Sequence, residues 1–217
     1  MADGDVPSPR LTVGAKRADH HHDHGGVSGK LFEWVMVVSM LVGRGAAARM
    51  VADLAELGPG DQIVDVGCGP GAAVREAAKR GAEAVGIDPN VAMLKLGRWI
   101  TSLRRTKGVR FAEGSAESLP VSDASVTVVW ALSSVHHWRD RSVGLAEARR
   151  ILRPGGRLFL VERSLVAGAR VHAGHGMTAE QVEELAKGVS AVGFVDVRTQ
   201  PKQARRKRLV VVTAVRA

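Results

Sequence analysis

The sequence predicts an α/β fold in which a doubly wound, mostly parallel sheet carries helices on both faces. Over residues 62–162, short apolar runs alternate with amphipathic runs, which is the pattern of repeated strand–helix units. A glycine-rich turn at residues 67–71 joins the first strand to the first helix. The last two apolar runs, residues 194–199 and 208–215, have no helix between them, so we expect them to pair antiparallel.

Length and composition fit one globular domain with a flexible end. The chain has 217 residues, of which 45% are hydrophobic and 24% charged, so collagen-like and wholly disordered classes are excluded. Residues 1–30 are polar and rich in Gly and His; we predict a flexible segment there and a single domain over residues 31–217. The longest apolar run, residues 35–43, is too short to cross a bilayer. With Cys68 as its one cysteine, the chain has no internal disulfide, and we expect a cytoplasmic protein.

Two helices are predicted before the first strand, within residues 31–57. Gly43 and Gly45 should separate them, and the Gly-Pro-Gly sequence at 58–60 should end the second one. The apolar residues that recur at helical spacing are Leu31, Trp34, Val35, Val38, Leu41, Val42, Met50, Leu54 and Leu57.

The strand–helix units then follow in order, each marked by a change from an apolar run to an amphipathic one. The predicted strands are residues 62–66, 83–87, 109–113, 125–131 and 157–162. The predicted helices are residues 71–80, 91–105, 142–152 and 178–192. Residues 154–156, Pro-Gly-Gly, predict a turn before the fifth strand, Thr178 predicts an N-cap, and Gly193 predicts a left-handed cap after the last helix.

The strongest motif is residues 64–71, Val-Asp-Val-Gly-Cys-Gly-Pro-Gly, placed where a doubly wound fold binds its ligand. Gly67 permits the tight turn, Gly69 lets the backbone approach a ligand, and Gly71 opens a helix whose free N–H groups face the site. Asp88 ends the next strand, where a carboxylate can accept hydrogen bonds from both hydroxyls of a ribose. The loop also fits the dinucleotide pattern, so these residues alone predict a nucleoside cofactor without choosing its kind.

Residues 65–71 resemble the first motif of the class I S-adenosylmethionine-dependent methyltransferases. Further segments are similar to the small-molecule, type 11 branch that includes ubiquinone and menaquinone biosynthesis enzymes. These segments are residues 86–89, 114–120, 130–138 and 150–156. The resemblance runs from about residue 54 to the end. It implies a Rossmann-like sheet of seven strands in the order 3-2-1-4-5-7-6 and S-adenosylmethionine as cofactor.

The resemblance also implies roles for single residues. Asp65 would favour the ammonium group of the cofactor, Asp88 would hold the ribose, Glu117 would receive the adenine amino group, and Ala131 would offer its backbone to the methionine moiety. Each acid also has a structural alternative: Asp65 as a charge partner of a helix N-terminus, Asp88 as a turn-capping aspartate, and Glu117 as a surface acid. The implied cofactor-binding residues are Asp65, Gly67, Cys68, Gly69, Gly71, Asp88, Pro89, Ala116, Glu117, Ala131 and Leu132.

Two histidines are candidates for catalysis. A methyl sulfonium needs no activation, so positioning should supply most of the rate, with help from a general base if the acceptor is a hydroxyl. His136 and His137 lie on the ligand edge of the predicted sheet, and a structural role or packing against the cofactor is an equally good interpretation of both. The histidines of residues 20–24 are only a compositional signal for metal, and we predict no metal site.

The chain has 31 Lys and Arg residues and 22 Asp and Glu residues, which gives a net charge of +9. This charge favours anionic partners. The leading hypothesis is a methyltransferase for a small-molecule acceptor, for which an anionic compound fits the charge. An RNA methyltransferase is the first alternative, although the Asn-Pro-Pro-aromatic and Pro-Cys motifs are absent. A dinucleotide oxidoreductase is a further alternative, but the chain has no tyrosine and therefore lacks the Tyr-Lys pair of short-chain dehydrogenases. A non-catalytic binding protein is separated from the enzyme only by an activity measurement.

Overall fold

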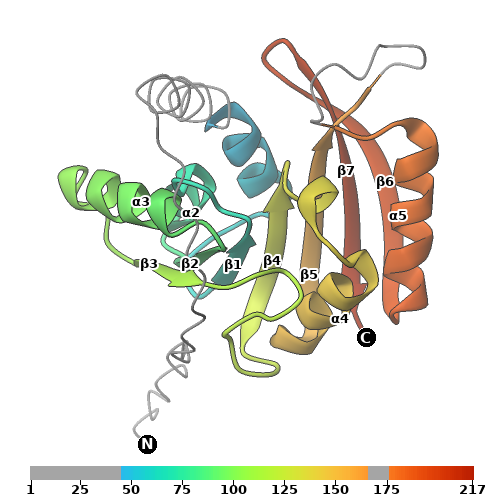
Figure 1. Cartoon of the computed structure of the whole chain (residues 1–217), viewed down its shortest axis with the longest axis horizontal. Coiled ribbons are helices and arrows are strands. Elements are labelled where there is room, and N and C mark those ends of the chain that lie inside the picture. Colours follow the sequence, from blue (N-terminus) through green and yellow to red (C-terminus); the bar gives the residue numbers. More distant parts are fainter. Residues whose placement is uncertain (1–44, 166–175) are drawn as a thin grey trace, which may run out of the picture.

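The computed structural model describes residues 45–165 and 176–217, which form a seven-stranded sheet with helices on both faces (Figure 1). The strands are β1 (Gln62–Val66), β2 (Glu83–Asp88), β3 (Val109–Glu113), β4 (Val126–Leu132), β5 (Leu152–Arg163), β6 (Phe194–Ala204) and β7 (Lys207–Arg216). The helices are α2 (Ala72–Lys79), α3 (Val91–Leu103), the 3-10 helix η1 (Val135–His137), α4 (Arg141–Ile151) and α5 (Ala179–Ala191). A further helix covers residues 45–54. The predicted fold class is therefore confirmed.

The strand order, β3-β2-β1-β4-β5-β7-β6, is the predicted one. The first five strands pair in parallel, whereas β7 is antiparallel to both β5 and β6. The connection predicted over residues 200–207 is shorter than expected, because both strands continue until only Arg205 and Arg206 form the turn. Arg205 takes the positive φ of 54° that this tight turn requires.

One other local prediction needs correction. The Pro-Gly-Gly turn at residues 154–156 lies inside β5, where the pairing passes from Val126–Leu152 to Val128–Arg157, so the extra residues form a bulge. Gly45 is the first described residue and begins the described helix of residues 45–54, so the predicted separation of two helices at Gly43 and Gly45 lies outside the described residues. The other predicted helix and the predicted flexible segment fall in residues 1–44, outside the described part.

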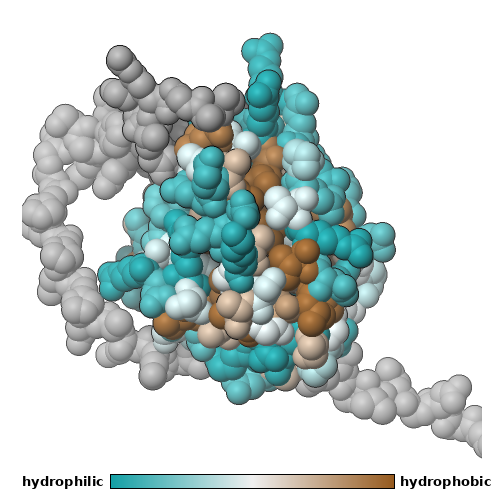
Figure 2. All heavy atoms as spheres, turned by 90° about the vertical axis from the view of Figure 1, so that its right-hand side faces the viewer, coloured by the Kyte–Doolittle hydropathy of each residue, from teal (hydrophilic) through white to brown (hydrophobic). Residues whose placement is uncertain are grey.

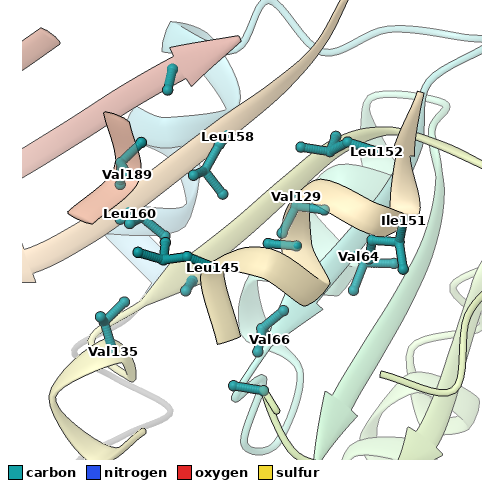
Figure 3. Packing of buried hydrophobic residues seen from close by; sticks show 14 of the residues in the cluster. Val64, Val66, Val129, Val135, Leu145, Ile151, Leu152, Leu158, Leu160 and Val189 are labelled. Carbon is teal, nitrogen blue, oxygen red and sulfur yellow. The ribbon is translucent and has the colours of Figure 1, made fainter. Parts of the chain in front are cut away.

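The core has two layers because the sheet is covered on both faces. Alternate residues of β1 enter different layers: Val64 and Val66 pack with residues of α4 and α5, such as Leu145 and Val189 (Figure 3). Ile63 enters the layer formed with α2 and the helix of residues 45–54. All seven residues of the central β4 are buried, as a strand covered on both faces requires. The side of the molecule that carries α5 is covered mainly by hydrophilic side chains, with apolar patches between them (Figure 2).

The start of α5 gives a prediction about stability. Thr178 and Gln181 form a reciprocal capping box, in which each side chain accepts a hydrogen bond from the other residue's backbone N–H. We expect Thr178→Ala to lower the free energy of unfolding by about 1 kcal/mol, measured by urea denaturation. Ser190→Ala, in the last turn of the same helix, is the matched control and should be nearly neutral; equal losses in both variants would contradict the capping role.

Candidate cofactor site

A cavity of about 500 Å³ opens where β1, β2, β3 and β4 end. Its wall is made by Val66, Gly67, Gly69, Asp88, Pro89, Asn90, Met93, Gly114, Ser115, Ala116, Glu117, Ser133, Ser134, His137, Trp138 and Arg139. These residues follow the carboxyl ends of neighbouring parallel strands, the place where open α/β sheets bind ligands. The cavity is therefore the candidate cofactor site.

The glycine loop has a backbone that only glycine adopts easily. Gly67 has a φ of +73°, and a Cβ added there would lie 2.5 Å from the Cβ of Ser134. At Gly71, with a φ of +74°, an added Cβ would lie 2.5 Å from the ring of Phe111. The N–H groups of Gly67 and Cys68 both donate to the carbonyl oxygen of Ile87, at 2.8 and 3.1 Å. The loop is thus fixed to the end of β2.

Asp88 ties the glycine loop to the start of α3. Its Oδ2 accepts a hydrogen bond from the N–H of Gly69, and its Oδ1 accepts one from the N–H of Asn90, both at 2.8 Å. A carboxylate offers about four lone-pair sites, so each oxygen keeps capacity for a ligand hydroxyl. Asn90 in turn caps α3 by accepting from the N–H groups of Ala92 and Met93. The carboxylate of Asp88, which is predicted to bind the ribose, is therefore held in a fixed orientation on the cavity wall.

Glu117 links two loops on the opposite side of the cavity. Its Oε1 accepts hydrogen bonds from the N–H groups of Arg139 at 2.8 Å and Asp140 at 3.3 Å. Burial raises the pKa of this carboxyl, but hydrogen bonds from the backbone and from Ser115 outweigh that effect and hold the pKa below its ordinary value of 4.5. Glu117 is accordingly ionised at neutral pH.

This pKa shift predicts how stability depends on pH. Because the folded state lowers the pKa of Glu117, its contribution is present above pH 4.5 and is lost as the pH falls through the lower folded-state pKa. We expect Glu117→Gln to be less stable than the wild type at neutral pH, and the difference to shrink in acid. Urea denaturation across the pH range measures this, with Glu113→Gln as an exposed control. A difference that stays constant with pH would contradict it.

Arg150 fixes the loop that carries Ala116 and Glu117. Its guanidinium donates to the carbonyl oxygens of Leu119 and Val121. It also forms ion pairs with Glu147 at 2.6 Å and Asp123 at 2.5 Å. Hydrogen bonding to Glu147 raises the pKa of Arg150 and lowers the pKa of Glu147 itself. Arg150 of α4 thus binds two loop carbonyls and two carboxylates with one side chain, and these contacts fix the loop that forms this wall of the cavity.

The structure brings together only part of the predicted cofactor set. Six of these residues line the cavity: Gly67, Gly69, Asp88, Pro89, Ala116 and Glu117. Five do not: Asp65, Cys68, Gly71, Ala131 and Leu132. Asp65 is 2% exposed inside β1, level with Gly86 and Trp130 of the neighbouring strands. Cys68 is buried against Gly86, so it lies behind the wall.

After β4, the residues that line the cavity come two positions later in the chain than the predicted ones. Ala131 and Leu132 are buried in the strand, and the cavity is lined by Ser133 and Ser134. The Ser134 hydroxyl donates to the carbonyl oxygen of Val66 at 2.6 Å and so holds this loop against the end of β1. Ser133 has a φ of +53°, an unusual backbone for a residue other than glycine.

The two candidate histidines differ in their surroundings. His137 lines the cavity. His136 lies against β5, where its Nδ1 is 2.9 Å from Oε2 of Glu162 and its side chain is 8% exposed. The other oxygen of Glu162 accepts a hydrogen bond from the N–H of Val135 at 2.9 Å. The two imidazole rings are 4.0 Å apart between centroids.

Sequence reasoning missed Glu162, which is 1% exposed. A signal was present, because Glu162 is an acid that directly follows the apolar run of residues 158–161. Parallel pairing of Leu132 with Val161 places it beside the residues that follow β4.

Within residues 45–165 and 176–217, no three His, Cys, Asp or Glu side chains are grouped as a metal site. The histidines of residues 20–24 are outside these ranges. None of the helices described here is long and apolar enough to span a membrane.

Comparisons with known proteins agree with this geometry. Residues 64–160 match the family described as "Methyltransferase domain". The uncharacterized methyltransferase YdaC of Bacillus subtilis (strain 168) is 30% identical over 159 residues, which cover 71% of this chain and 83% of that protein. The chain belongs to the type 11 branch of the class I S-adenosylmethionine-dependent methyltransferases. S-adenosylmethionine is therefore its cofactor.

Other members of the family extend the comparison. The 27-O-demethylrifamycin SV methyltransferase of Amycolatopsis mediterranei (strain S699) is 38% identical over 160 residues, covering 70% of this methyltransferase chain and 56% of that protein. The chain thus spans about half the length of that curated relative. The crystal structure of a SAM dependent methyltransferase from Aquifex aeolicus has a TM-score of 0.67 at 16% identity, covering 89% of this chain and all of that one, which shows a shared fold.

Proposed function

We propose that this methyltransferase transfers the methyl group of S-adenosylmethionine to a small-molecule acceptor. The observation that carries the proposal is the cavity at the carboxyl edge of the sheet, with Asp88 beside the glycine loop and Glu117 across from it. The ribose would bind Asp88, and the adenine would lie near Pro89, Met93 and Ala116. The methionine moiety would extend toward Gly67.

The residues behind the wall have supporting roles in this proposal. Glu117 already receives two amides on Oε1, so its Oε2 would receive the adenine amino group. Ala131 and Leu132 would place the backbone of Ser133 and Ser134, while Asp65, Cys68 and Gly71 would shape the glycine loop. Asp65 would also contribute a negative charge toward the cofactor ammonium through the backbone of that loop.

For a hydroxyl acceptor, we propose His136 as the general base. A carboxylate at Nδ1 orients the imidazole and directs Nε2 away from Glu162. Nε2 would remove the acceptor proton while the acceptor oxygen attacks the methyl carbon. The bond from that carbon to sulfur breaks, its electron pair stays on sulfur, and S-adenosylhomocysteine leaves as a neutral thioether. Glu162 would stabilise the imidazolium that forms, and His137 would close the cavity wall.

The acceptor class follows from the family members and from charge. Two of them are named as methyltransferases of 27-O-demethylrifamycin SV and of demethylmenaquinone, and the net charge of +9 favours an acceptor that can ionise. We therefore propose an aromatic or polyketide-like small molecule with an acidic hydroxyl or activated ring carbon. No comparison supports the RNA alternative. The single cysteine, reduced and buried, suits a reaction in the cytoplasm.

The experiment is methyl transfer from methyl-labelled S-adenosylmethionine to a panel of hydroxyquinones, phenols and demethylated ansamycins. Label should enter the small-molecule extract, with one S-adenosylhomocysteine released for each methyl transferred. Total RNA is the competing acceptor in a parallel reaction. Label found only in RNA would contradict the small-molecule proposal. Binding of S-adenosylhomocysteine without transfer to any acceptor would favour a non-catalytic protein.

A further inference from the structure

The outer face of α3 combines cations with exposed apolar side chains. From Val91 to Ala112 the sequence carries six cations and no acid. These are Lys95, Arg98, Arg104, Arg105, Lys107 and Arg110, and all are exposed. The helix lies over the edge strand β3 at the outer end of the sheet (Figure 1). This segment therefore supplies a large part of the net charge of +9 on one side of the molecule.

These cations are scarcely neutralised by the protein. Within the described ranges, Arg110 alone among the six forms an ion pair, with Glu83 at 3.7 Å. An open groove of about 670 Å³ lies between the end of α3 and β3. Its charged lining residues are all cations, accompanied by the hydroxyls of Ser102 and Thr106. Arg98 is held over the groove by donating to the carbonyl oxygen of Phe111 at 2.9 Å.

An apolar pair lies on the neighbouring side of α3, where it lines a second hollow with Glu76 and several cations of α2 and the helix of residues 45–54. Trp99 is 63% exposed and Leu103 is 69% exposed. They are four residues apart on α3, so they lie one above the other on the same side of the helix. Large exposed apolar side chains ringed by cations are the composition of helices that rest in the interface of an anionic membrane.

The combination favours a lipid surface over a nucleic acid. A base stacks well on an aromatic ring such as Trp99, but an aliphatic side chain such as Leu103 offers no comparable partner. Acyl chains accept both side chains. The phosphates of lipid headgroups, spaced across a plane, would meet the cations of the groove and helix while the pair inserts between them.

We propose that the outer face of α3 docks this methyltransferase on anionic phospholipid membranes. Trp99 and Leu103 enter the headgroup layer, and Arg98, Arg105 and Lys107 bind lipid phosphates. The first turn of the same helix, at Asn90 and Met93, borders the cofactor cavity, so docking holds the cavity close to the lipid surface. The inference concerns binding alone and stands whether or not the proposed reaction is correct.

The test is sedimentation of the full chain with vesicles of phosphatidylcholine, with and without phosphatidylglycerol. We expect binding only where phosphatidylglycerol is present, and a blue shift of tryptophan emission that is absent from Trp99→Phe. Each cation at an anionic surface contributes roughly fivefold to partitioning, so Arg98→Glu/Arg105→Glu/Lys107→Glu should bind at least about 100-fold more weakly. Trp99→Ala/Leu103→Ala should lose the part of binding that resists salt.

Two controls separate docking from net charge and from folding defects. Arg153→Glu/Lys187→Glu/Arg198→Glu changes the charge equally at exposed positions of β5, α5 and β6, outside the hollows that border α3, and should keep most vesicle binding. Affinity for S-adenosylhomocysteine should be unchanged in every variant. Equal losses in both charge-reversal variants, or no loss in either α3 variant, would overturn the proposal. So would binding of an RNA oligonucleotide that depends on the same α3 residues while vesicle binding does not.

Discussion

Replacing His136 by alanine is expected to lower the rate of methyl transfer to a hydroxyl acceptor by roughly 10²- to 10⁴-fold. The affinity for S-adenosylhomocysteine should stay within about twofold of the wild type, because His136 does not line the cofactor cavity. Its Nδ1 is bonded instead to the buried Glu162, an arrangement that orients a base. Single-turnover rates with labelled cofactor, alongside calorimetry, measure the two effects separately.

Glu162→Gln is the matched test of the orienting carboxylate. The amide oxygen can still accept the N–H of Val135, so the local backbone is kept, while the charge that stabilises the imidazolium is removed. We expect a smaller loss of rate than in His136→Ala and a changed pH profile. Full turnover in His136→Ala and in His137→Ala would show that neither histidine is a base and that positioning alone is sufficient.

Asp88→Ala is expected to weaken the binding of S-adenosylhomocysteine by about 100-fold or more, as measured by calorimetry. Two hydrogen bonds from ribose hydroxyls to a carboxylate would be lost, each contributing roughly 1.5–3 kcal/mol. The substitution also removes the acceptors for the N–H groups of Gly69 and Asn90, so the glycine loop should lose its link to the start of α3.

Asp88→Asn separates these two contributions. One amide oxygen can still accept from Asn90, but an amide NH₂ group would face the N–H of Gly69, where a donor meets a donor. We expect an intermediate affinity. Unchanged affinity in both variants would mean that the ribose binds elsewhere.

The fold could be predicted because its signals are local. Val64 and Val66 alternate with Ile63 in an apolar run, Gly67 needs a positive φ, and Asp88 ends the next apolar run. The strand order came from a resemblance, and the antiparallel end from the short connection before β7. Local signals are weaker at ends of elements: the Pro-Gly-Gly sequence at 154–156 is as typical of a bulge as of a turn, and tertiary pairing decides between them.

The site could be predicted less completely, because a cavity wall depends on side-chain direction. Ala131 and Leu132 were predicted from the family resemblance, yet β4 continues through Leu132, and Ser133 takes a left-handed backbone that no local sequence pattern predicts. The pairing of His136 with Glu162 joins residues 26 positions apart. It exists only because β5 lies parallel to β4, so neither residue indicates the pair by itself.

The most direct test of the central claim is a crystal structure with S-adenosylhomocysteine at saturating concentration. We expect the nucleoside in the cavity of about 500 Å³, with both ribose hydroxyls on Asp88 and the thioether sulfur facing the space beyond Ser134. Density for the nucleoside at another place, or protein side chains filling that cavity while the compound is absent, would contradict the account.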